Sequence, residues 1–463
     1  MSGSQKYFIG QSVSKVKKPK KKGLAYWLWT GIGLSGVAIL SATAGAWLAL
    51  SLSATPLRQS TLTPEEEAIF SQKEAVARTN LQIPELARPV NILVIGTKVL
   101  TSDIRESPDA DLGYHALVNS FEGLADTMLL VRFDPQAEKL TALSIPRDTR
   151  TEIEDYGVAK INFTNSYGGP ALTAQTVSNL LEEVPIDRYV RVNVQGVEKL
   201  IDALGGVIVN VPKDMKYQDD SQHLYINLKK GTQHLDGEKA VQFLRFRQDA
   251  YGDIGRVQRQ QLLMRSLVEQ ALKPSTVVRI PKILSIIQSH IDTNLTVEEL
   301  VALAGFATNM QRSDVQMLMV PGDFSNGQSQ TSYWLPDEER IQAMMAQHFD
   351  IGYSYTSEAD PAEVQVAIQD STGDPEAVQA IVNYLQELGY QKVYISSDWP
   401  VPLQTTKIVA QKGDDASAAA IRVALGVGEV LVESTGSLAS DVTIQLGEDW
   451  QQQQIFDDDT YYQ

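Results

Sequence analysis

The sequence predicts an α/β protein with two folded domains behind a single transmembrane helix. Three observations lead to this prediction. An uncharged stretch covers residues 23–57, apolar runs alternate with helical patterns from Pro89 onward, and a second β-α-β-β-α-β order begins at 363. Strands and helices in succession predict sheets that are covered by helices. A chain of 463 residues has room for two such domains.

The N-terminal region has the pattern of a membrane anchor. Residues 1–22 carry seven lysines and no acid, and are expected to be a basic cytoplasmic tail. Residues 23–55 exceed the roughly 20 apolar residues that a span needs, with tryptophans near both ends. The alternative is a cleaved signal peptide, favoured by the small residues 42–44. Because the apolar stretch exceeds the roughly 7–15 residues of a signal core, an uncleaved anchor is favoured. The bulk of the chain would then lie outside the cytoplasmic (inner) membrane.

Composition divides the rest of the chain. Residues 56–88 are polar and are expected to form a stalk or linker, with a short helix that begins after Thr63. A first domain is expected at 89–350, a polar linker at 351–362, a second domain at 363–450, and a frayed tail at 451–463. About 90 residues suffice for a small α/β domain of the second kind.

Short apolar runs and helical periodicity place the elements of the first domain. Val90–Ile95 ends at Gly96 as a buried strand would, and Asp134-Pro135-Gln136 separates two runs as a hairpin turn would. Strands are predicted at 90–95, 127–133, 140–145, 189–194, 207–211 and 316–320, and helices from near 172 to 181, up to 204, and at 237–244, 255–272, 280–291 and 296–307.

The second domain is predicted from the same signals. Its strands are expected at 363–368, 392–395, 407–410 and 442–446, with helices at 375–388 and 416–425. It shows no chemistry of its own.

Composition also narrows the classes of function. The formal net charge is -17, which argues against nucleic acid as a partner, because nucleic-acid binding needs a basic surface. The absence of cysteine excludes thiolate zinc sites and cysteine nucleophiles. The five histidines show no metal-binding spacing. Nucleotide-binding glycine motifs and a G-x-S-x-G motif are absent from the sequence.

Arginines gather in one stretch, residues 244–261, in spite of the negative net charge. Alternation places Arg245 and Arg247 on one face if that part is extended. In the following helix, Arg256, Arg259 and Gln260 share a face at i, i+3 and i+4. Guanidinium binds phosphate oxygens in pairs, so this stretch predicts a phosphate receptor. The alternative is a solvated helix start whose charges pair with nearby aspartates.

A second charged group follows the predicted strand at 140–145. Residues 144–149 read Ser-Ile-Pro-Arg-Asp-Thr and place Arg147 and Asp148 at the carboxyl end of that strand, with Lys160 further along. Ligands in open α/β sheets bind outside such strand ends. The alternative is a loop whose charges lie in solvent, and Asp126 could likewise be only a polar strand start.

Taken together, the motifs resemble the LytR–CpsA–Psr family. The stretches NILVIG, ADTMLLVRFDP, LSIPRDT, KIN with YGGP, LGGVIVNVP, LDGEKAVQFLRFR and GRVQRQQ occur in the family's order, over core motifs at 89–272. Residues 363–450, with VAIQDSTG and VTIQLGEDW, resemble the C-terminal domain that many members carry. The resemblance implies a transferase that moves glycopolymers from a polyprenyl-pyrophosphate carrier onto peptidoglycan, without a nucleotide. It also implies a sheet-based fold with an apolar lipid tunnel.

The resemblance assigns expected roles by position. Pyrophosphate binding falls on Arg147, Arg245, Arg247, Arg256 and Gln260, and Arg259 and Lys160 stand among the same motifs. The attacking group would be a hydroxyl of peptidoglycan. Asp126 matches one of two magnesium-binding aspartates, and Asp126 or Asp148 is a candidate base.

The sequence departs from the family at the metal site. Lys98 stands where the family usually has aspartate, so Mg²⁺ should bind more weakly, since it prefers oxygen ligands. Lys98 could supply positive charge itself, or Asp103, Asp109 or Asp111 could complete the site. These departures keep two other functions open. One is a non-catalytic lipid-pyrophosphate-binding factor that organises septum or wall, and the other is a polyprenyl-pyrophosphate hydrolase.

Overall fold

The computed structural model describes residues 57–71, 73–77, 84–98, 121–220, 224–246, 252–277, 279–311, 314–325, 332–352, 360–396, 398–399, 401–411, 413–433, 435–437 and 439–450. The expected cytoplasmic tail, the expected anchor at 23–55 and the expected tail at 451–463 lie outside these ranges. Within the ranges, no helix combines the length and apolarity that crossing a bilayer requires. The membrane span therefore stays a prediction.

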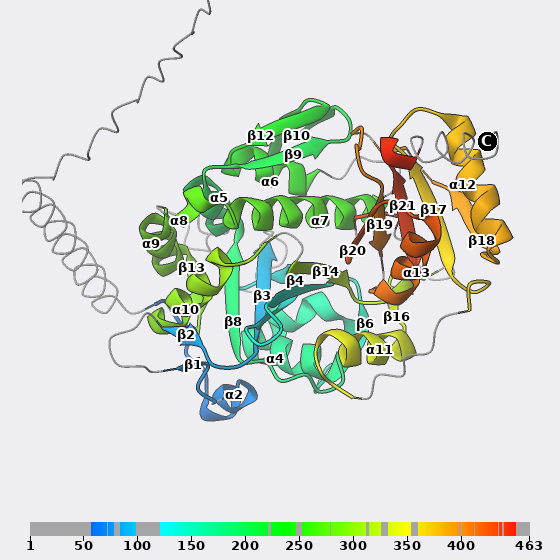
Figure 1. Cartoon of the computed structure of the whole chain (residues 1–463). Coiled ribbons are helices and arrows are strands. Elements are labelled where there is room, and N and C mark those ends of the chain that lie inside the picture. Colours follow the sequence, from blue (N-terminus) through cyan, green and yellow to red (C-terminus); the bar gives the residue numbers. More distant parts are fainter. Residues whose placement is uncertain are drawn as a thin grey trace, which may run out of the picture. The chain divides into compact units, whose positions relative to one another are not determined.

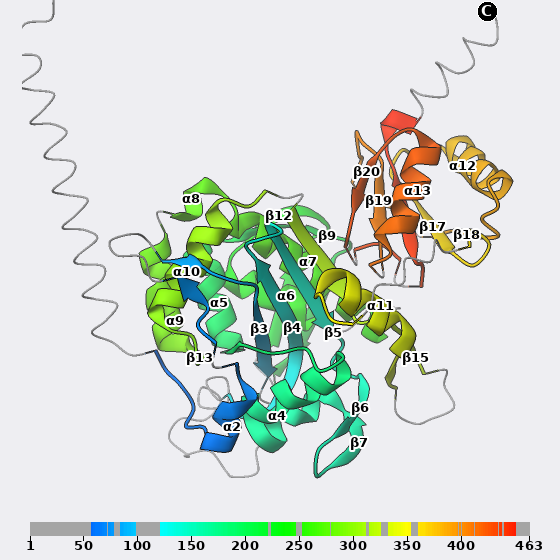
Figure 2. The ribbon, with the colours of Figure 1, turned by 60° about the horizontal axis from the view of Figure 1, so that its bottom comes forward.

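A six-stranded sheet forms the centre of the first domain, with the order β13-β8-β3-β4-β5-β14 (Figures 1 and 2). Its strands are β3 (Val90–Lys98), β4 (Leu124–Asp134), β5 (Lys139–Ile145), β8 (Arg188–Asn193), β13 (Ile291–Thr293) and β14 (Val315–Met319). Strand β4 is antiparallel to β3 and β5, which confirms the predicted hairpin. Because β3 is parallel to β8 and β5 is parallel to β14, the carboxyl ends within each pair lie at the same edge of the sheet.

Helices cover both faces of this sheet, as Figure 1 shows for α7 and α4. The first face packs against α2 (Pro64–Ile69), α4 (Thr164–Leu180) and α11 (Glu338–His348), and the second against α7 (Gly252–Ala271) and α10 (Val297–Thr308). Alternation along β4 explains the two faces. Met128 and Leu130 belong to the first core, whereas Val131 and Phe133 pack with Met264 of α7.

A smaller apolar core adjoins the second face. It unites α5 (Val194–Leu204), α6 (Gly237–Arg245), β9 (Val207–Val211), β10 (Met215–Asp219), β11 (Leu224–Leu228) and β12 (Gly231–Leu235) with Leu263 of α7. The turn from α5 to β9 requires glycine, because Gly205 and Gly206 have φ of 87° and 82°. This is the tight helix-to-strand turn that the sequence predicted.

The segment before the sheet packs into the first domain. Helix α2 begins as predicted, with Thr63 and Glu66 forming a capping box and proline at the first turn. Phe70, which follows the helix, is 2% exposed and belongs to the core of the first face. The described part of the expected stalk is therefore attached to the domain rather than free of it.

Several elements differ from the sequence prediction. Helix α4 begins at Thr164 rather than near 172, with a break at Gly168 and Gly169 where the turn was expected. The described part of 274–350 holds four strands where one was predicted. Three of them, β13, β15 (Gly322–Phe324) and β16 (Trp334–Pro336), have three residues each, which is too short for a periodicity signal. The remaining elements of this domain are β1 (Val76–Ala77), β2 (Glu85–Leu86), β6 (Arg150–Ile153), β7 (Gly157–Lys160), η2 (Ile161–Phe163), α8 (Pro274–Val277) and α9 (Ile280–His290).

The second domain has its own sheet and core, as predicted. Its strands are ordered β18-β17-β21-β19-β20, with bounds β17 (Gln365–Asp370), β18 (Lys392–Ile395), β19 (Lys407–Ala410), β20 (Glu429–Leu431) and β21 (Val442–Leu446). Helices α12 (Pro375–Glu387) and α13 (Asp415–Leu425) pack against it. Only β20 was not predicted.

Candidate functional site

Charged side chains from two neighbouring strands meet at one edge of the central sheet. Asp126 lies near the start of β4, and Arg147 follows the end of β5, which pairs with β4. The Arg147 guanidinium forms an ion pair with Asp126, and its Nε lies 3.6 Å from Oδ2 of Asp148. Lys160 Nζ donates to Oδ1 of Asp148 at 2.8 Å. The structure thus places four predicted residues in one chain of alternating charge.

The loop that carries Arg147 is held by hydrogen bonds on several sides. The Thr149 hydroxyl donates to the Pro146 carbonyl at 2.6 Å, and the Asn162 amide donates to the Arg147 carbonyl at 3.2 Å. The Trp334 amide donates to the Asp148 carbonyl at 2.9 Å. A loop bonded in this way keeps its side chains in fixed positions, as a binding site requires.

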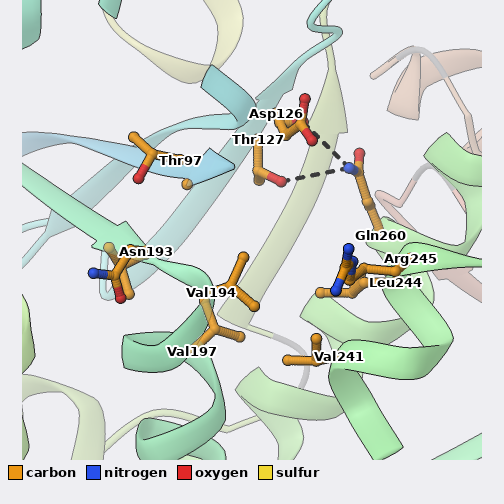
Figure 3. Close-up of a pocket in the computed structure, with 12 residues that line it drawn as sticks. Thr97, Asp126, Thr127, Asn193, Val194, Val197, Val241, Leu244, Arg245 and Gln260 are labelled. Carbon is orange, nitrogen blue, oxygen red and sulfur yellow. Dashed lines mark hydrogen bonds between the residues drawn. The ribbon is translucent and has the colours of Figure 1, made fainter. Parts of the chain in front are cut away.

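A cavity of about 90 Å³ opens beside this charged chain, here called the Arg245 cavity (Figure 3). Arg245, Asp126 and Gln260 face into it from α6, β4 and α7. The Gln260 side-chain amide donates to the Asp126 carbonyl at 3.2 Å and to the Thr127 hydroxyl at 3.4 Å. The complete lining is Gly96, Thr97, Asp126, Thr127, Val192, Asn193, Val194, Val197, Val241, Leu244, Arg245 and Gln260.

The wall opposite the charges is apolar. Val192 and Val194 come from the junction of β8 and α5, where Asn193 caps the helix by accepting from the Gly196 amide at 2.8 Å. Thr97 adds a buried hydroxyl that finds no hydrogen-bond partner within the described residues. The cavity has one cation, Arg245, on one side and valines on the other, and Arg147 lies next to it through its ion pair with Asp126. This arrangement suits a ligand with an anionic group joined to an apolar chain.

A second cavity continues along the same face of the sheet, here called the Met264 cavity. It shares Thr127 and Gln260 with the Arg245 cavity and has a volume of about 30 Å³. Its lining is Thr127, Leu129, Ala142, Ser144, Gln260, Gln261, Met264, Val268, Met317, Leu318 and Thr435. This lining is mostly apolar and lies between α7 and strands β4, β5 and β14.

The walls of the two cavities were not predicted from the sequence. The valines of the cavity were interpreted as ordinary core residues of a strand and a helix. One signal pointed to them: the predicted strand at 189–194 ends at Val194, and ligands bind outside such carboxyl ends. Gly96 carries a second signal, since a Cβ there would lie 3.1 Å from Cβ of Thr127, a contact tighter than side chains normally make.

Arg245 lies in a helix, whereas an extended segment was considered from the sequence. It is the last residue of α6, so its position is set by the helix and not by strand alternation. Its position at the helix C-terminus is favourable for a cation, because the carbonyl ends carry partial negative charge.

Arg259 does not line either cavity. It is 4% exposed, its guanidinium donates to the Phe246 carbonyl, and its Cζ lies 5.7 Å from the centre of the Phe246 ring. This geometry favours a role in positioning the end of α6, next to Arg245, over direct contact with a ligand. The side chains of Lys98 and Arg256, and the whole of Arg247, lie outside the described residues.

The described residues do not fit a magnesium site by themselves. They contain no group of three carboxylate or imidazole side chains that could hold a metal. Asp126 is paired with Arg147, and Asp148 with Lys160. Asp103, Asp109 and Asp111, the other candidate ligands, lie outside the described ranges. The structure therefore leaves the magnesium expectation as it stood in the sequence.

Comparisons with known proteins place this site in a family context. The sequence profile of the LytR_cpsA_psr family matches residues 57–350, and a profile described as LytR cell envelope-related transcriptional attenuator matches 363–450. The polyisoprenyl-teichoic acid–peptidoglycan teichoic acid transferase TagV of Bacillus subtilis (strain 168) is 33% identical over 240 residues, which cover 50% of this chain and 61% of that protein.

Two further matches are a second relative and a solved structure. A protein with the same transferase description, TagU of Bacillus cereus, is 28% identical over 305 residues, or 65% of this chain and 89% of TagU. The crystal structure of B. subtilis TagV matches at a TM-score of 0.47 with 29% identity, over 57% of this chain and 99% of that one. The alignment with TagV covers less than two thirds of the length of that relative.

Proposed function

Because this chain belongs to the LytR_cpsA_psr family, we propose that it is a transferase that moves a glycopolymer from a polyprenyl-pyrophosphate carrier onto peptidoglycan. The observation that supports this most is the Arg245 cavity, in which the Arg245 side chain faces an apolar wall at the edge of the sheet. A polyprenyl pyrophosphate has the same two parts, a dianionic head and an apolar chain. We place the protein outside the cytoplasmic membrane, anchored by residues 23–55.

The proposed reaction is phosphoryl transfer. A peptidoglycan hydroxyl attacks the phosphorus that bears the glycopolymer, and a new O–P bond forms. The P–O bond to the carrier breaks, and polyprenyl phosphate leaves with the electron pair. Catalysis of this kind needs mainly positioning and charge neutralisation. Arg147, Arg245 and Lys160 supply positive charge, and Arg247 and Arg256 are expected to add to it.

The proton of the attacking hydroxyl needs an acceptor. Asp126 suits this role better than Asp148, because Asp126 lines the Arg245 cavity and Asp148 does not. Asp148 is 6% exposed and pairs with both Arg147 and Lys160. Asp148 is therefore assigned to positioning these two cations, and Asp126 to proton transfer. No step requires a nucleotide, since the pyrophosphate bond supplies the driving force.

The test is an incubation of the full-length protein, in detergent, with a polyprenyl-pyrophosphate glycan and peptidoglycan fragments. Transfer predicts a phosphodiester-linked product together with polyprenyl phosphate. A hydrolase would release both parts without linking the glycan to peptidoglycan. A binding factor would retain the intact donor. Either of the last two results, with active controls, contradicts the proposal.

A further inference from the structure

The two domains share a short stretch of β-structure at the open edge of the central sheet. Strand β14 is the last strand of that sheet, and its Met317 amide donates to the Val432 carbonyl at 2.8 Å. Met317 and Glu433 form a parallel bridge. The segment that follows β20 thus continues the sheet of the first domain.

An ion pair of the buried Glu433 holds this contact between the two domains, here called the seam (Met317 with Val432 and Glu433), against α7. The Glu433 side chain is fully buried, and its Oε2 lies 3.5 Å from Nη1 of Arg265. The same oxygen accepts from the Thr435 hydroxyl at 3.0 Å. A carboxylate buried at 0% exposure needs partners, so its place opposite α7 is strongly specified.

Thr435 connects this contact between the domains to the apolar Met264 cavity. It is 8% exposed and lines the Met264 cavity together with residues of β4, β5, β14 and α7. Every other lining residue belongs to the first domain. Thr127 and Gln260 line both cavities, so the Met264 cavity lies next to the Arg245 cavity and reaches the second domain at Thr435.

We propose that the second domain supplies the far wall of the lipid site, with Thr435 in contact with the carrier's polyprenyl chain beyond its first isoprene units. This inference rests on the proposed function, since it takes the ligand to be a polyprenyl pyrophosphate. It gives Thr435, in the segment after β20, a role in carrier recognition. The Met264 cavity, at about 30 Å³, has room for little more than water. Its lining side chains must therefore move when the polyprenyl chain enters. Only chains long enough to reach this lining gain the contact.

The direct test uses photo-labelling of the full-length protein. Prenyl pyrophosphates of graded length, from farnesyl to undecaprenyl, carry a diazirine at the end of the chain. Peptides labelled on irradiation are identified by mass spectrometry. The shortest probe should label only the first domain, and a longer one should label the peptide that contains Thr435. Labelling confined to the first domain at every length overturns the inference.

A pair of variants gives an independent readout of the same contact. Thr435→Phe fills the Met264 cavity, so we expect it to raise the Kd of the longer prenyl pyrophosphates by roughly tenfold, as overpacking of a filled site does. Farnesyl pyrophosphate should bind unchanged. The control Val423→Phe adds the same ring at a site on α13 that is 75% exposed, and should change neither Kd.

The outcomes separate this inference from the proposed function. Should Thr435→Phe fold, as judged by its melting temperature, and bind both lengths as the parent does, the wall is not formed by Thr435. Should it fail to fold, the labelling of the unmodified protein decides. A protein that binds and labels as expected but transfers no glycan contradicts the proposed function alone. A protein that transfers glycan but is never labelled on the peptide that contains Thr435 contradicts this inference alone.

Discussion

Arg245 is the residue from which the site's chemistry can be tested most directly. It lines the Arg245 cavity. Arg150 serves as a control, because it lies in β6 with an exposed side chain and does not line that cavity. Loss of a cation that faces developing phosphate charge costs about 100-fold or more in kcat. We expect Arg245→Ala to lose transfer to that extent, and Arg150→Ala to keep most of it.

The melting temperature separates binding from folding in this pair. Arg245 is a partly buried residue at the end of a helix, so its loss should lower stability only modestly. An inactive Arg245→Ala that melts like its parent supports the assigned role. Retention of full activity would show that the cavity does not hold the reacting phosphate.

Magnesium dependence is decided by individual carboxylates. Asp126 is already paired with Arg147, and Lys98 stands at the second family position. We therefore expect chelation by EDTA to lower the rate by less than about tenfold, equivalent to roughly 1.4 kcal/mol. Complete loss in EDTA, restored by Mg²⁺, would instead show that residues outside the described ranges complete a metal site.

Individual residues show where the sequence analysis reached its limit. The resemblance assigned Asp126 and Arg147 to one site, and the pairing of β4 with β5 does bring them together. Arg259 was expected with Gln260 because helical spacing puts both on one face. Spacing does not say which neighbour that face meets, and here Arg259 meets Phe246. The apolar wall was invisible for the same reason, since a cavity valine and a core valine have the same pattern.

Among the elements, β8 and β13 are joined by a buried charged network. Asp292 of β13, 1% exposed, accepts from Arg191 Nε at 2.7 Å, from the Tyr189 hydroxyl at 3.2 Å and from the Ser60 amide at 2.7 Å. Burial, and secondarily the charge of Asp292, raises the pKa of Tyr189, which keeps this hydroxyl a hydrogen-bond donor.

Removing the charge of Asp292 should therefore destabilise the first domain. Asp292→Asn leaves Arg191 buried without its counter-ion, a change that typically costs about 3–5 kcal/mol. Denaturant unfolding of the full-length protein measures it. As a control, Asp214→Asn removes an exposed partner of Lys229 and should change stability little. Equal stabilities for the two variants would show that the network contributes nothing.

The end of α11 adds a pH-sensitive contact between the domains. His348 lies with Nδ1 3.1 Å from Gln316 Oε1 and Nε2 3.3 Å from the Gly413 carbonyl. Burial lowers the pKa of His348, although the Gly413 carbonyl and Asp415 act in the opposite direction; Lys139 adds to the lowering. The folded protein thus binds a proton less readily here than the unfolded chain does.

The sign of the pH effect follows from that difference. As the pH falls below about 6.5, the unfolded chain protonates its histidine first, so stability decreases until the lowered pKa is reached. Above about pH 6.5, His348 is neutral in both the folded and the unfolded protein, so it no longer makes stability depend on pH. We expect the melting temperature to fall more between neutral and mildly acid pH in the parent than in His348→Gln. Parallel pH profiles for the two proteins would contradict this.

Element boundaries were predictable to different degrees for physical reasons. Strands β3, β4 and β5 were found because they are long and apolar. Hairpin β6–β7 has a mixed, largely exposed sequence, and was missed. Strand β13 is three residues long, and its place is decided by pairing with β8 across about a hundred residues of chain. Local pattern carries no information about such a distant partner.

For the molecule as a whole, the separate sheet of the second domain was predictable, but its contact with β14 was not. Nothing in the sequence near Val432 marks it as a partner of β14. We expect a chain that lacks residues 360–463 to melt at a lower temperature and to aggregate, because the edge of β14 loses its cover and Arg265 loses Glu433. Light scattering during heating measures this. A truncated chain that stays monomeric and melts like its parent would show that the seam adds nothing.

The paired edge of β14 has a consequence for comparisons across the family. A chain with the same six-stranded sheet but no second domain has to protect that edge in another way. Natural sheets do so with lysine, proline, a bulge or a covering loop. In this protein the Met317 amide donates to the Val432 carbonyl, so proline, which has no amide hydrogen, is excluded at this position. In shorter relatives we expect proline or an inward lysine to become common there, so that one alignment column should tell the two architectures apart.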